Sequence, residues 1–350
     1  MKLRKTWLKA VSAAVLAGTA FGAAAQDKVL NIYSARHYQS DQIIYDTFTR
    51  TTGIRINRIE SDDAGIVNRL RTEGSASPAD VVLLVDAARM ATADAQGLFQ
   101  PIKSAKLDAA IPDNLRAQRT ADGVTWTGFS KRARVVVYDP KRVKPEDVQT
   151  YEQLADPKLK GMICSRSGSH PYNLSLFATI VERIGDARGE AWLKGLANNM
   201  ARAPKGGDTD QVRAVAAGEC AVAITNSYYL ARLIKSGKPE DKAVMDKVRV
   251  IHPNQATTGT HVNIAGGAVA KHAKNRDHAI QFMEFLATDF AQDYFANGNN
   301  EYATAKNVVI NNEALNSIGG KSFKVENIPL AAVARNLTKV QQMLDRVGFK

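Results

Sequence analysis

Two short stretches of the sequence place tyrosines at the same distance from a cysteine. Tyr172 lies eight positions after Cys164, and the pair Tyr228 and Tyr229 begins eight positions after Cys220. A phenol, whose usual pKa is about 10, must lose its proton to bind a metal, and phenolate oxygen suits the hard Fe(III) ion better than Zn(II), Cu(I) or Ni(II). Three such phenols in one place would make a ferric-iron site, whereas each one alone is equally compatible with packing or hydrogen bonding.

The residues around these tyrosines predict that each group lies where a strand passes into a helix. A strand ending at Cys164 leads through residues 165–171 to a helical apolar pattern that begins at Tyr172. A strand over residues 221–225 leads to a second helix that begins near Tyr228. The N-terminus of a helix favours negative charge, and it therefore favours a phenolate at these positions.

Cys164 and Cys220 are the only cysteines of the chain. An exported protein meets oxidising conditions, so we expect a disulfide between them. Two buried free thiols remain the alternative, because the sequence does not give the distance between the Cα atoms. The bridge would hold the two strand–helix units side by side and bring Tyr172 within reach of Tyr228 and Tyr229.

The first 25 residues have the composition of a secretory signal peptide. Basic residues precede an apolar stretch over residues 10–17 that is too short to span a bilayer, and Ala23 and Ala25 form a small-residue cleavage site. We expect cleavage after Ala25 and a mature chain that is free in the periplasm. No later apolar run is long enough for a membrane span.

Loss of the leader would lower the formal net charge from +12 to +8, because it carries Lys2, Arg4, Lys5 and Lys9. A positive charge of this size suits an anionic surface, an acidic partner or an anionic ligand. It does not indicate nucleic-acid binding, because the basic residues are scattered among acidic ones and no basic run is interleaved with aromatic residues. The roughly 325 residues that remain are enough for two domains.

The pattern after the leader predicts an α/β fold. A strand over residues 29–33, a helical pattern through 43–48 that stops at Gly53, and a strand over 54–59 form a β-α-β unit. Residues 79–85 are a nearly continuous apolar run, which is typical of a parallel strand covered on both faces. Strands and helices alternate along the rest of the chain, so we expect doubly wound sheets.

Two crossings between lobes are predicted, by a strand over residues 134–140 and by a return strand over 261–268. Two α/β lobes joined by strands imply a cleft, and ligands of such sheets bind outside the carboxyl ends of the strands. The second lobe would carry the tyrosines. The expected bounds are 26–131 plus about 261–307 for the first lobe, and 132–260 plus about 308–350 for the second.

No motif of a common enzyme class accompanies the tyrosines. HExxH, GxSxG, the phosphate-binding P-loop and GxGxxG are all absent from the sequence. An iron-tyrosinate oxygenase or phosphatase remains an alternative, but it would also need several His or carboxylate ligands. We therefore expect a binding protein rather than an enzyme, and the other alternative to iron is thiamine, a polyamine, phosphonate or sulfate in the same cleft.

Three stretches of the sequence, in this order, resemble the periplasmic ferric-ion-binding proteins of bacterial ABC transporters. They are YSARHY at residues 33–38, GMICSRSGSHPYN at 161–173, and residues 218–229, which begin GEC and end NSYY. The resemblance covers essentially the whole mature chain. It implies a type II periplasmic-binding fold, Fe(III) held between the lobes, and delivery to a permease in the inner membrane, for which a monomer is the expected state.

By this resemblance, Tyr172, Tyr228 and Tyr229 are phenolate ligands of the iron. Some members of the family complete the coordination shell with a His and a Tyr of the first lobe, and His37 and Tyr38 occupy the matching positions. Other members use carbonate or another small anion in their place. This sequence therefore has the residues for the first arrangement, without showing that it uses them.

Arg36 and Arg134 are the candidates for binding such an anion. Arg36 lies in the first strand-to-helix turn, and Arg134 lies at the start of the predicted crossing strand. Either guanidinium could hold a carbonate through two hydrogen bonds, or form a salt bridge within the protein instead. The family resemblance favours Arg134, in the pattern Arg132-x-Arg134–Val135.

Overall fold

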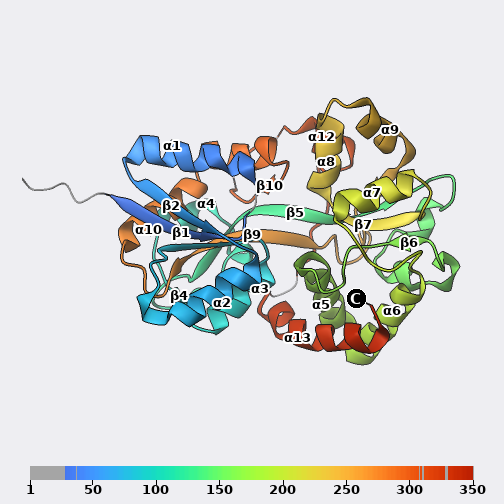
Figure 1. Cartoon of the computed structure of the whole chain (residues 1–350), viewed down its shortest axis with the longest axis horizontal. Helices are drawn as coiled ribbons and strands as arrows, with labels where there is room; N and C mark the ends of the chain where they lie inside the picture. The colour runs from blue at the N-terminus through green and yellow to red at the C-terminus, as the bar shows by residue number, and fades with distance from the viewer. Residues whose placement is uncertain (1–27, 37, 307, 310, 328–329, 350) are drawn as a thin grey trace, which may run out of the picture.

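The computed structural model describes residues 28–36, 38–306, 308–309, 311–327 and 330–349. The predicted leader and His37 lie outside these residues. Two lobes lie along the longest axis of the molecule, and the long strands β5 and β9 join them (Figure 1). The strands are β1 (Val29–Ser34), β2 (Arg55–Glu60), β3 (Val81–Leu84), β4 (Phe99–Gln100), β5 (Trp126–Tyr138), β6 (Ile163–Cys164), β7 (Val222–Asn226), β8 (Arg249–Ile251), β9 (Val262–Ala270) and β10 (Tyr302–Ala303).

The strands form a mixed sheet that runs through both lobes in the order β2-β1-β3-β9-β5-β7-β6. β1 is parallel to β2 and to β3, and β6 is parallel to β7. β5 and β9 are antiparallel to all of their neighbours. β5 pairs with β9 up to Ala133 and with β7 from Arg134 onward, so that one strand belongs to both lobes.

Helices cover both faces of the sheet in each lobe (Figure 1). In the first lobe these are α1 (Gln42–Thr52), α2 (Asp63–Glu73), α3 (Ala87–Ala95), α4 (Ala105–Ala110), α10 (Arg276–Leu286), α11 (Asp289–Asp293) and a π-helix (Tyr294–Gly298). In the second lobe they are α5 (Pro171–Ile184), α6 (Asp186–Asn198), α7 (Asp208–Ala216), α8 (Ser227–Lys235), α9 (Pro239–Lys247), α12 (Glu313–Ser317) and α13 (Leu330–Val347). The last helix, α13, contacts both α5 and α3.

Local sequence features set the ends of these helices. The side chain of Asp86 caps α3, because it accepts hydrogen bonds from the backbone N–H groups of Ala88 and Arg89. α1 ends at Gly53, whose φ of 71° is left-handed and costs a glycine nothing. The sequence-based stop at Gly53 is therefore confirmed.

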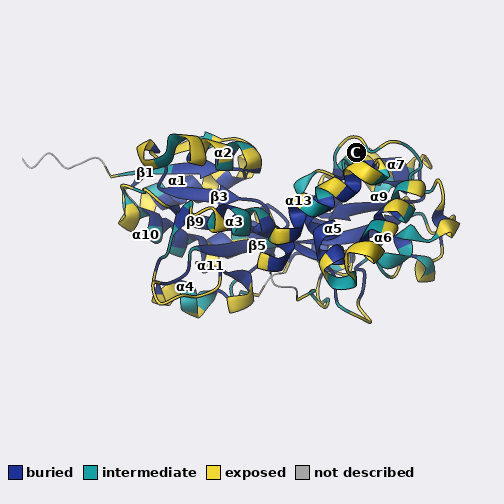
Figure 2. Ribbon diagram, turned by 90° about the horizontal axis from the view of Figure 1, so that it is seen from below, coloured by how far each residue is buried: buried dark blue, intermediate teal, exposed yellow. Residues whose placement is uncertain are grey.

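Each lobe has a hydrophobic core of its own, formed where the buried strands meet the inner faces of the helices (Figure 2). Ile32 and Phe282 are fully buried in the first lobe. Val136 and Phe177 are fully buried in the second. Separate cores allow two domains to keep their shapes while they move relative to each other.

The expected α/β class is confirmed, and the structure corrects one detail of the crossing strand. That strand was expected over residues 134–140, but β5 begins eight residues earlier, at Trp126. The first half escaped prediction because Gly128 interrupts the apolar pattern, and the register of β5 against β9 shifts between Gly128 and Ser130. The predicted lobe boundaries fall inside β5 and directly before β9.

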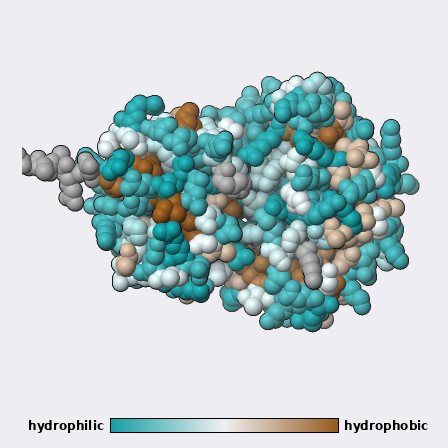
Figure 3. Space-filling model, in the orientation of Figure 1, coloured by the Kyte–Doolittle hydropathy of each residue, from teal (hydrophilic) through white to brown (hydrophobic). Residues whose placement is uncertain are grey.

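The apolar side chains lie mostly inside the two lobes. Among the residues that the structure describes, no helix is long and apolar enough to cross a membrane. The face in Figure 3 is largely hydrophilic, and its hydrophobic atoms form small separate patches. The large hydrophobic residues that are exposed are Ile43, Ile234, Phe290 and Val309.

Candidate metal centre

Tyr172 is the second residue of α5, which begins directly after the loop that follows β6. Nδ1 of His170 accepts a hydrogen bond of 3.3 Å from the backbone N–H of Tyr172 and so caps the helix. The phenol is only 2% exposed. Burial raises the pKa of Tyr172 to about 12, although the charge of nearby Arg132 opposes this rise. The group is therefore a neutral phenol at neutral pH, and a metal would have to displace its proton to bind it.

Tyr228 and Tyr229 are the second and third residues of α8, which follows β7 with no intervening loop. Their ring centroids are 4.0 Å apart. Tyr228 is fully buried, and its hydroxyl has no hydrogen-bond partner of acceptable geometry within the described part of the chain. Burial raises the pKa of Tyr228 well above its usual value, and the charges that Tyr172, Tyr38 and Tyr229 would carry on ionisation raise it further.

These phenols fit a hard, highly charged cation. A buried hydroxyl without a partner costs free energy, and a metal ion beside Tyr228 would satisfy it. Phenols close enough to raise one another's pKa values cannot all ionise unless a positive charge lies among them. Their anionic oxygen donors suit Fe(III), the ion that the sequence analysis predicts.

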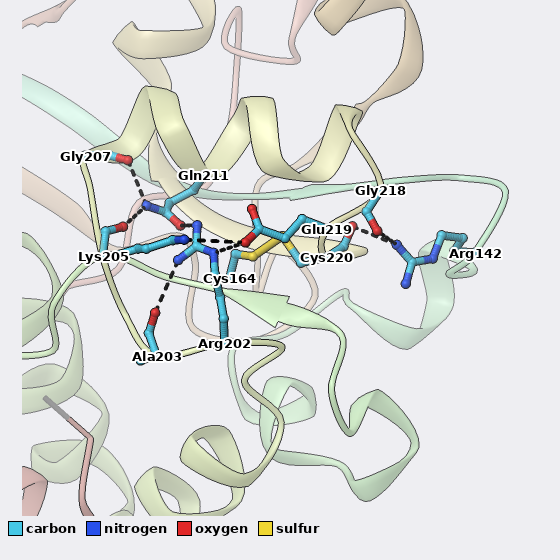
Figure 4. The surroundings of a disulfide bond; sticks show 10 residues. All are labelled: Arg142, Cys164, Arg202, Ala203, Lys205, Gly207, Gln211, Gly218, Glu219 and Cys220. Atoms are coloured by element: carbon cyan, nitrogen blue, oxygen red, sulfur yellow. Dashed lines mark hydrogen bonds and ion pairs between the residues drawn. A yellow bond between two sulfur atoms is a disulfide. The ribbon is translucent and has the colours of Figure 1, made fainter.

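The predicted disulfide between Cys164 and Cys220 is confirmed, with Cα atoms 5.8 Å apart (Figure 4). Cys164 ends β6 and pairs in parallel with Ala223 of β7. The bridge therefore links the end of β6 to a residue two positions before β7, and the carboxyl ends of these neighbouring strands lead to Tyr172 and Tyr228. This arrangement explains why two distant stretches of sequence deliver their tyrosines to the same edge of the sheet.

Tyr38 reaches the same place from the first lobe. It precedes a short 3₁₀ turn (Gln39–Asp41), and its ring lies edge-on to that of Tyr228, with centroids 5.9 Å apart. Its hydroxyl donates a hydrogen bond of 3.1 Å to Oε1 of Glu301. Burial and the charge of Glu301 raise the pKa of Tyr38 well above its usual value. Four of the five predicted metal ligands thus lie together, while the fifth, His37, is outside the described residues.

Several arginines place positive charge beside the phenols, and Arg132 and Arg232 are two of them. The guanidinium carbon of Arg132 lies 5.6 Å from the ring centroid of Tyr172. That of Arg232 lies 4.8 Å from the centroid of Tyr228 and 5.0 Å from that of Tyr38, so this side chain contacts rings from both lobes. A nearby cation stabilises a phenolate, and both arginines therefore favour ionisation of the phenols.

The two arginines predicted to bind an anion are already paired with buried carboxylates. Nε of Arg36 lies 2.6 Å from Oδ2 of Asp41, and Nη2 lies 3.2 Å from Oε2 of Glu301. Nη1 of Arg134 lies 2.5 Å from Oδ2 of Asp208. An anion would have to compete with these carboxylates, and the anion-binding role of both arginines stays a prediction.

A cavity of about 570 Å³ lies beside Tyr172 and is lined by both lobes. It is large enough for a small anion or chelator next to the phenols. Its charged or titratable residues come mainly from the first lobe, and a turn before α5 closes the other side. Those lining it are Arg36, Glu60, Asp62, Asp63, Arg89 and His170.

Three residues of this centre were missed in the sequence analysis. Glu301 and Asp208 gave no local signal, because the arginines that they pair with are 169 and 74 positions away. Arg232 did give one: it lies four positions after Tyr228, and residues at this spacing share one face of a helix.

Comparison with known proteins gives the chain a family. The profile of a family described as bacterial extracellular solute-binding protein matches residues 44–316. Iron uptake protein A1 of Synechocystis sp. is 42% identical over 325 residues, which cover 93% of this chain and 88% of that protein. The major ferric iron-binding protein of Neisseria meningitidis serogroup B is 28% identical over 282 residues, which cover 80% of this chain and 82% of that protein.

Solved structures share the two-lobed architecture over nearly the whole chain. A Trichodesmium protein in complex with iron and citrate ligands is 45% identical, with a TM-score of 0.83, and the match covers 92% of this chain and 100% of that one. A ferric binding protein from Campylobacter jejuni is 37% identical, with a TM-score of 0.85 and the same coverage. By sequence and by fold, this chain belongs to the bacterial extracellular solute-binding proteins.

Proposed function

We propose that the protein binds ferric iron in the cleft between its lobes and delivers it to an ABC transporter permease in the inner membrane. The observation that carries this proposal is the meeting of Tyr172, Tyr228 and Tyr229, from two strand–helix units joined by the disulfide, with Tyr38 from the other lobe. Relatives named as an iron uptake protein and a ferric iron-binding protein support it, and so does the similar structure that contains iron and citrate.

In this proposal Tyr172, Tyr228 and Tyr229 bind the iron as phenolates. Tyr38 is a fourth phenolate, and His37, next to it in the sequence, completes the set from the first lobe. Three phenolates balance the charge of Fe(III), and a fourth leaves one negative charge. The guanidinium of Arg232, in contact with three of the four rings, balances that charge.

Carbonate or another small anion, such as citrate, would occupy the cavity beside Tyr172 when a coordination position is open. Arg36 lines this cavity and Arg134 is buried near Tyr172, so these are the side chains proposed to hold the anion. Each would exchange part of its carboxylate pairing for the anion.

Closure of the lobes would bring Tyr38 to the other three phenols and exclude water from the iron. Opening of the lobes separates these ligands, and protonation of the phenolates weakens their bonds to the metal. Both changes would release the iron to the permease.

The place of action proposed for the mature chain is the periplasm, reached through the signal peptide and cleavage after Ala25. The protein would act there as a monomer, without nucleic acid. The named relatives are uptake and binding proteins, which favours transport over catalysis.

The test is a visible absorption spectrum of the mature protein before and after addition of ferric nitrilotriacetate. Phenolate-to-Fe(III) charge transfer gives a broad visible band, and we expect this band in the wild type. Tyr228→Phe removes a ligand and should reduce iron affinity at least tenfold, with loss or shift of the band.

Tyr138→Phe is the matched control, because Tyr138 is a buried tyrosine at the far end of β5. It should leave the spectrum unchanged. The absence of a band in the wild type would contradict the proposal and would direct attention to an organic or oxyanion solute in the same cleft.

A further inference from the structure

We propose that Asp208 is the positioning residue of the tyrosine site: one buried carboxylate that fixes the segments carrying Tyr172, Tyr228 and Tyr229 relative to one another. This inference rests on the proposed function, because it concerns how the same three phenols are held for iron. Asp208 is the first residue of α7 and is completely buried. It does not itself belong to the tyrosine cluster.

Asp208 holds the start of α8 through the backbone. Its Oδ2 accepts a hydrogen bond of 2.7 Å from the N–H of Asn226. Asn226 is the last residue of β7 and the N-cap of α8, two positions before Tyr228. The carboxylate thereby fixes the point at which the chain turns from β7 into the helix that carries Tyr228 and Tyr229.

Asp208 holds the loop before Tyr172 through Arg166. Its Oδ1 lies 3.2 Å from Nη1 of Arg166. The guanidinium of Arg166 in turn lies 5.2 Å from the ring centroid of Tyr172. The same carboxylate therefore sets the position of a cation that lies against this phenol.

A third set of contacts leads from Asp208 through Arg134 to Asn173, the residue next to Tyr172. Nη1 of Arg134 contacts Asp208, and Nη2 donates a hydrogen bond of 2.5 Å to Oδ1 of Asn173. Nδ2 of Asn173 donates to the backbone oxygens of Arg166 and Ser167, each at 3.1 Å. Together, the contacts of Asp208 with Asn226, Arg166 and Arg134 form a closed ring of hydrogen bonds and ion pairs around the base of α5.

The loop that leads into α7, directly before Asp208, is itself held by hydrogen bonds, and Figure 4 shows those made by Gln211. Nε2 of Gln211 donates to the backbone oxygens of Lys205 at 2.6 Å and of Gly207 at 2.9 Å. Nη2 of Arg202 donates to Oε1 of Gln211 at 3.0 Å. Asp208 therefore cannot shift without disturbing this anchored loop.

The charge at Asp208 is needed for this arrangement. Two guanidiniums, those of Arg134 and Arg166, share the one carboxylate, and Arg134 is completely buried. A buried ion pair of this kind contributes little net stability, but removal of one partner leaves buried charge unpaired. In the proposed site these ion pairs act by fixing the positions of the tyrosines. Ligands held in place before the metal arrives bind more tightly than ligands that must be ordered.

The test compares Asp208→Asn with the wild type in the full mature chain. Asparagine keeps the size of the side chain but removes the charge that holds two arginines. After loading with ferric nitrilotriacetate, excess EDTA removes the iron, and loss of the visible band gives the release rate. We expect release about tenfold faster or more, the usual effect of losing a residue that orients a metal ligand. We also expect the band of the bound iron to shift in wavelength.

Asp241→Asn is the matched control, because Asp241 is a buried aspartate of the same lobe that pairs with Arg213 of α7 and contacts α8 at Ser236, at the opposite end from Tyr228 and Tyr229. It should leave both the rate and the band unchanged. If Asp208→Asn does not fold, Arg166→Gln tests the proposal instead. This change removes the contact between Arg166 and Asp208 and leaves Asp208 paired with Arg134. A release rate several times that of the wild type, with a shifted band, is expected there.

Wild-type rate and wavelength in the folded variant would overturn the proposal. Faster release with an unchanged band would indicate general loosening of the lobe and would overturn it as well. In both of these outcomes the wild type shows the band, and the proposed function stands. A wild type without the band would overturn both inferences together.

Discussion

The protonation state of each buried phenol determines how many protons the site must lose when it binds iron. Burial raises the pKa of Tyr172 to about 12 and raises the pKa values of Tyr228 and Tyr38 well above their usual value, so each is neutral at physiological pH. Iron must therefore displace one proton from each phenol that it binds. It follows that iron affinity rises with pH and that acid favours release.

Loading of the metal-free protein with ferric iron should release about three protons per iron if Tyr172, Tyr228 and Tyr229 bind, and about four if Tyr38 joins them. A pH-stat titration at neutral pH measures this number, after subtraction of the protons that the iron chelate exchanges without protein. Tyr38→Phe should lower the count by one. Release of fewer than two protons by the wild type would contradict phenolate ligation.

The strands and helices that position the tyrosines could be predicted from the sequence, because the patterns that indicate them involve only neighbouring residues. The strands before Tyr172 and Tyr228 are short apolar runs, and both helices begin at the tyrosines as expected. The presence of just two cysteines in a chain expected to be exported also predicted the disulfide, which is confirmed. The strands and helices depend on neighbouring residues, so periodicity is enough to find them.

The residues that hold these strands and helices in place could not be predicted in the same way. Asp208 and Glu301 resemble surface acids in the sequence, and only the fold brings each to buried arginines on β5. The exchange of partners along β5 was located only approximately, since the expected lobe boundary lies between residues 131 and 132, whereas β5 leaves β9 for β7 between Ala133 and Arg134. Long-range pairing leaves no periodic signal in a single sequence.

The disulfide joins the end of β6 to the segment before β7, and its contribution to stability can be measured. Cys164 and Cys220 are 56 positions apart, so the bond closes a long loop. Replacement of both by serine should lower the free energy of unfolding by about 4 kcal/mol, mainly because the unfolded chain gains freedom. Urea denaturation of the metal-free protein measures this. An unchanged midpoint would show that the bridge does not stabilise the second lobe.

At the scale of the whole molecule, the two lobes also touch away from the tyrosines. Nζ of Lys235, on α8, donates a hydrogen bond of 3.1 Å to the backbone oxygen of Asn297 in the π-helix of the first lobe. A cation near the C-terminal end of a helix is favourable. This contact breaks whenever the lobes separate, so it stabilises only the closed form.

Lys235→Met should therefore speed iron release without changing the visible spectrum. The effect should be small, at most about fivefold, because an exposed charged contact contributes about 1 kcal/mol or less. Stopped-flow mixing of the loaded protein with EDTA gives the rate. Lys242→Met, on the exposed face of α9, is the control and should match the wild type. Release as slow in Lys235→Met as in the control would show that the contact plays no part.

The strand β5 also limits the ways in which the lobes can separate. From Trp126 to Ala133 it is hydrogen-bonded to β9, and from Arg134 to Tyr138 it is hydrogen-bonded to β7. Sliding of one lobe along the other would break these ladders, whereas bending near residues 133 and 134 keeps them. Opening would thus be mainly a rotation about an axis near residues 133 and 134, beside the Arg134 that is bonded to Asp208. The same rotation that uncovers the cleft would strain the base of the tyrosine cluster.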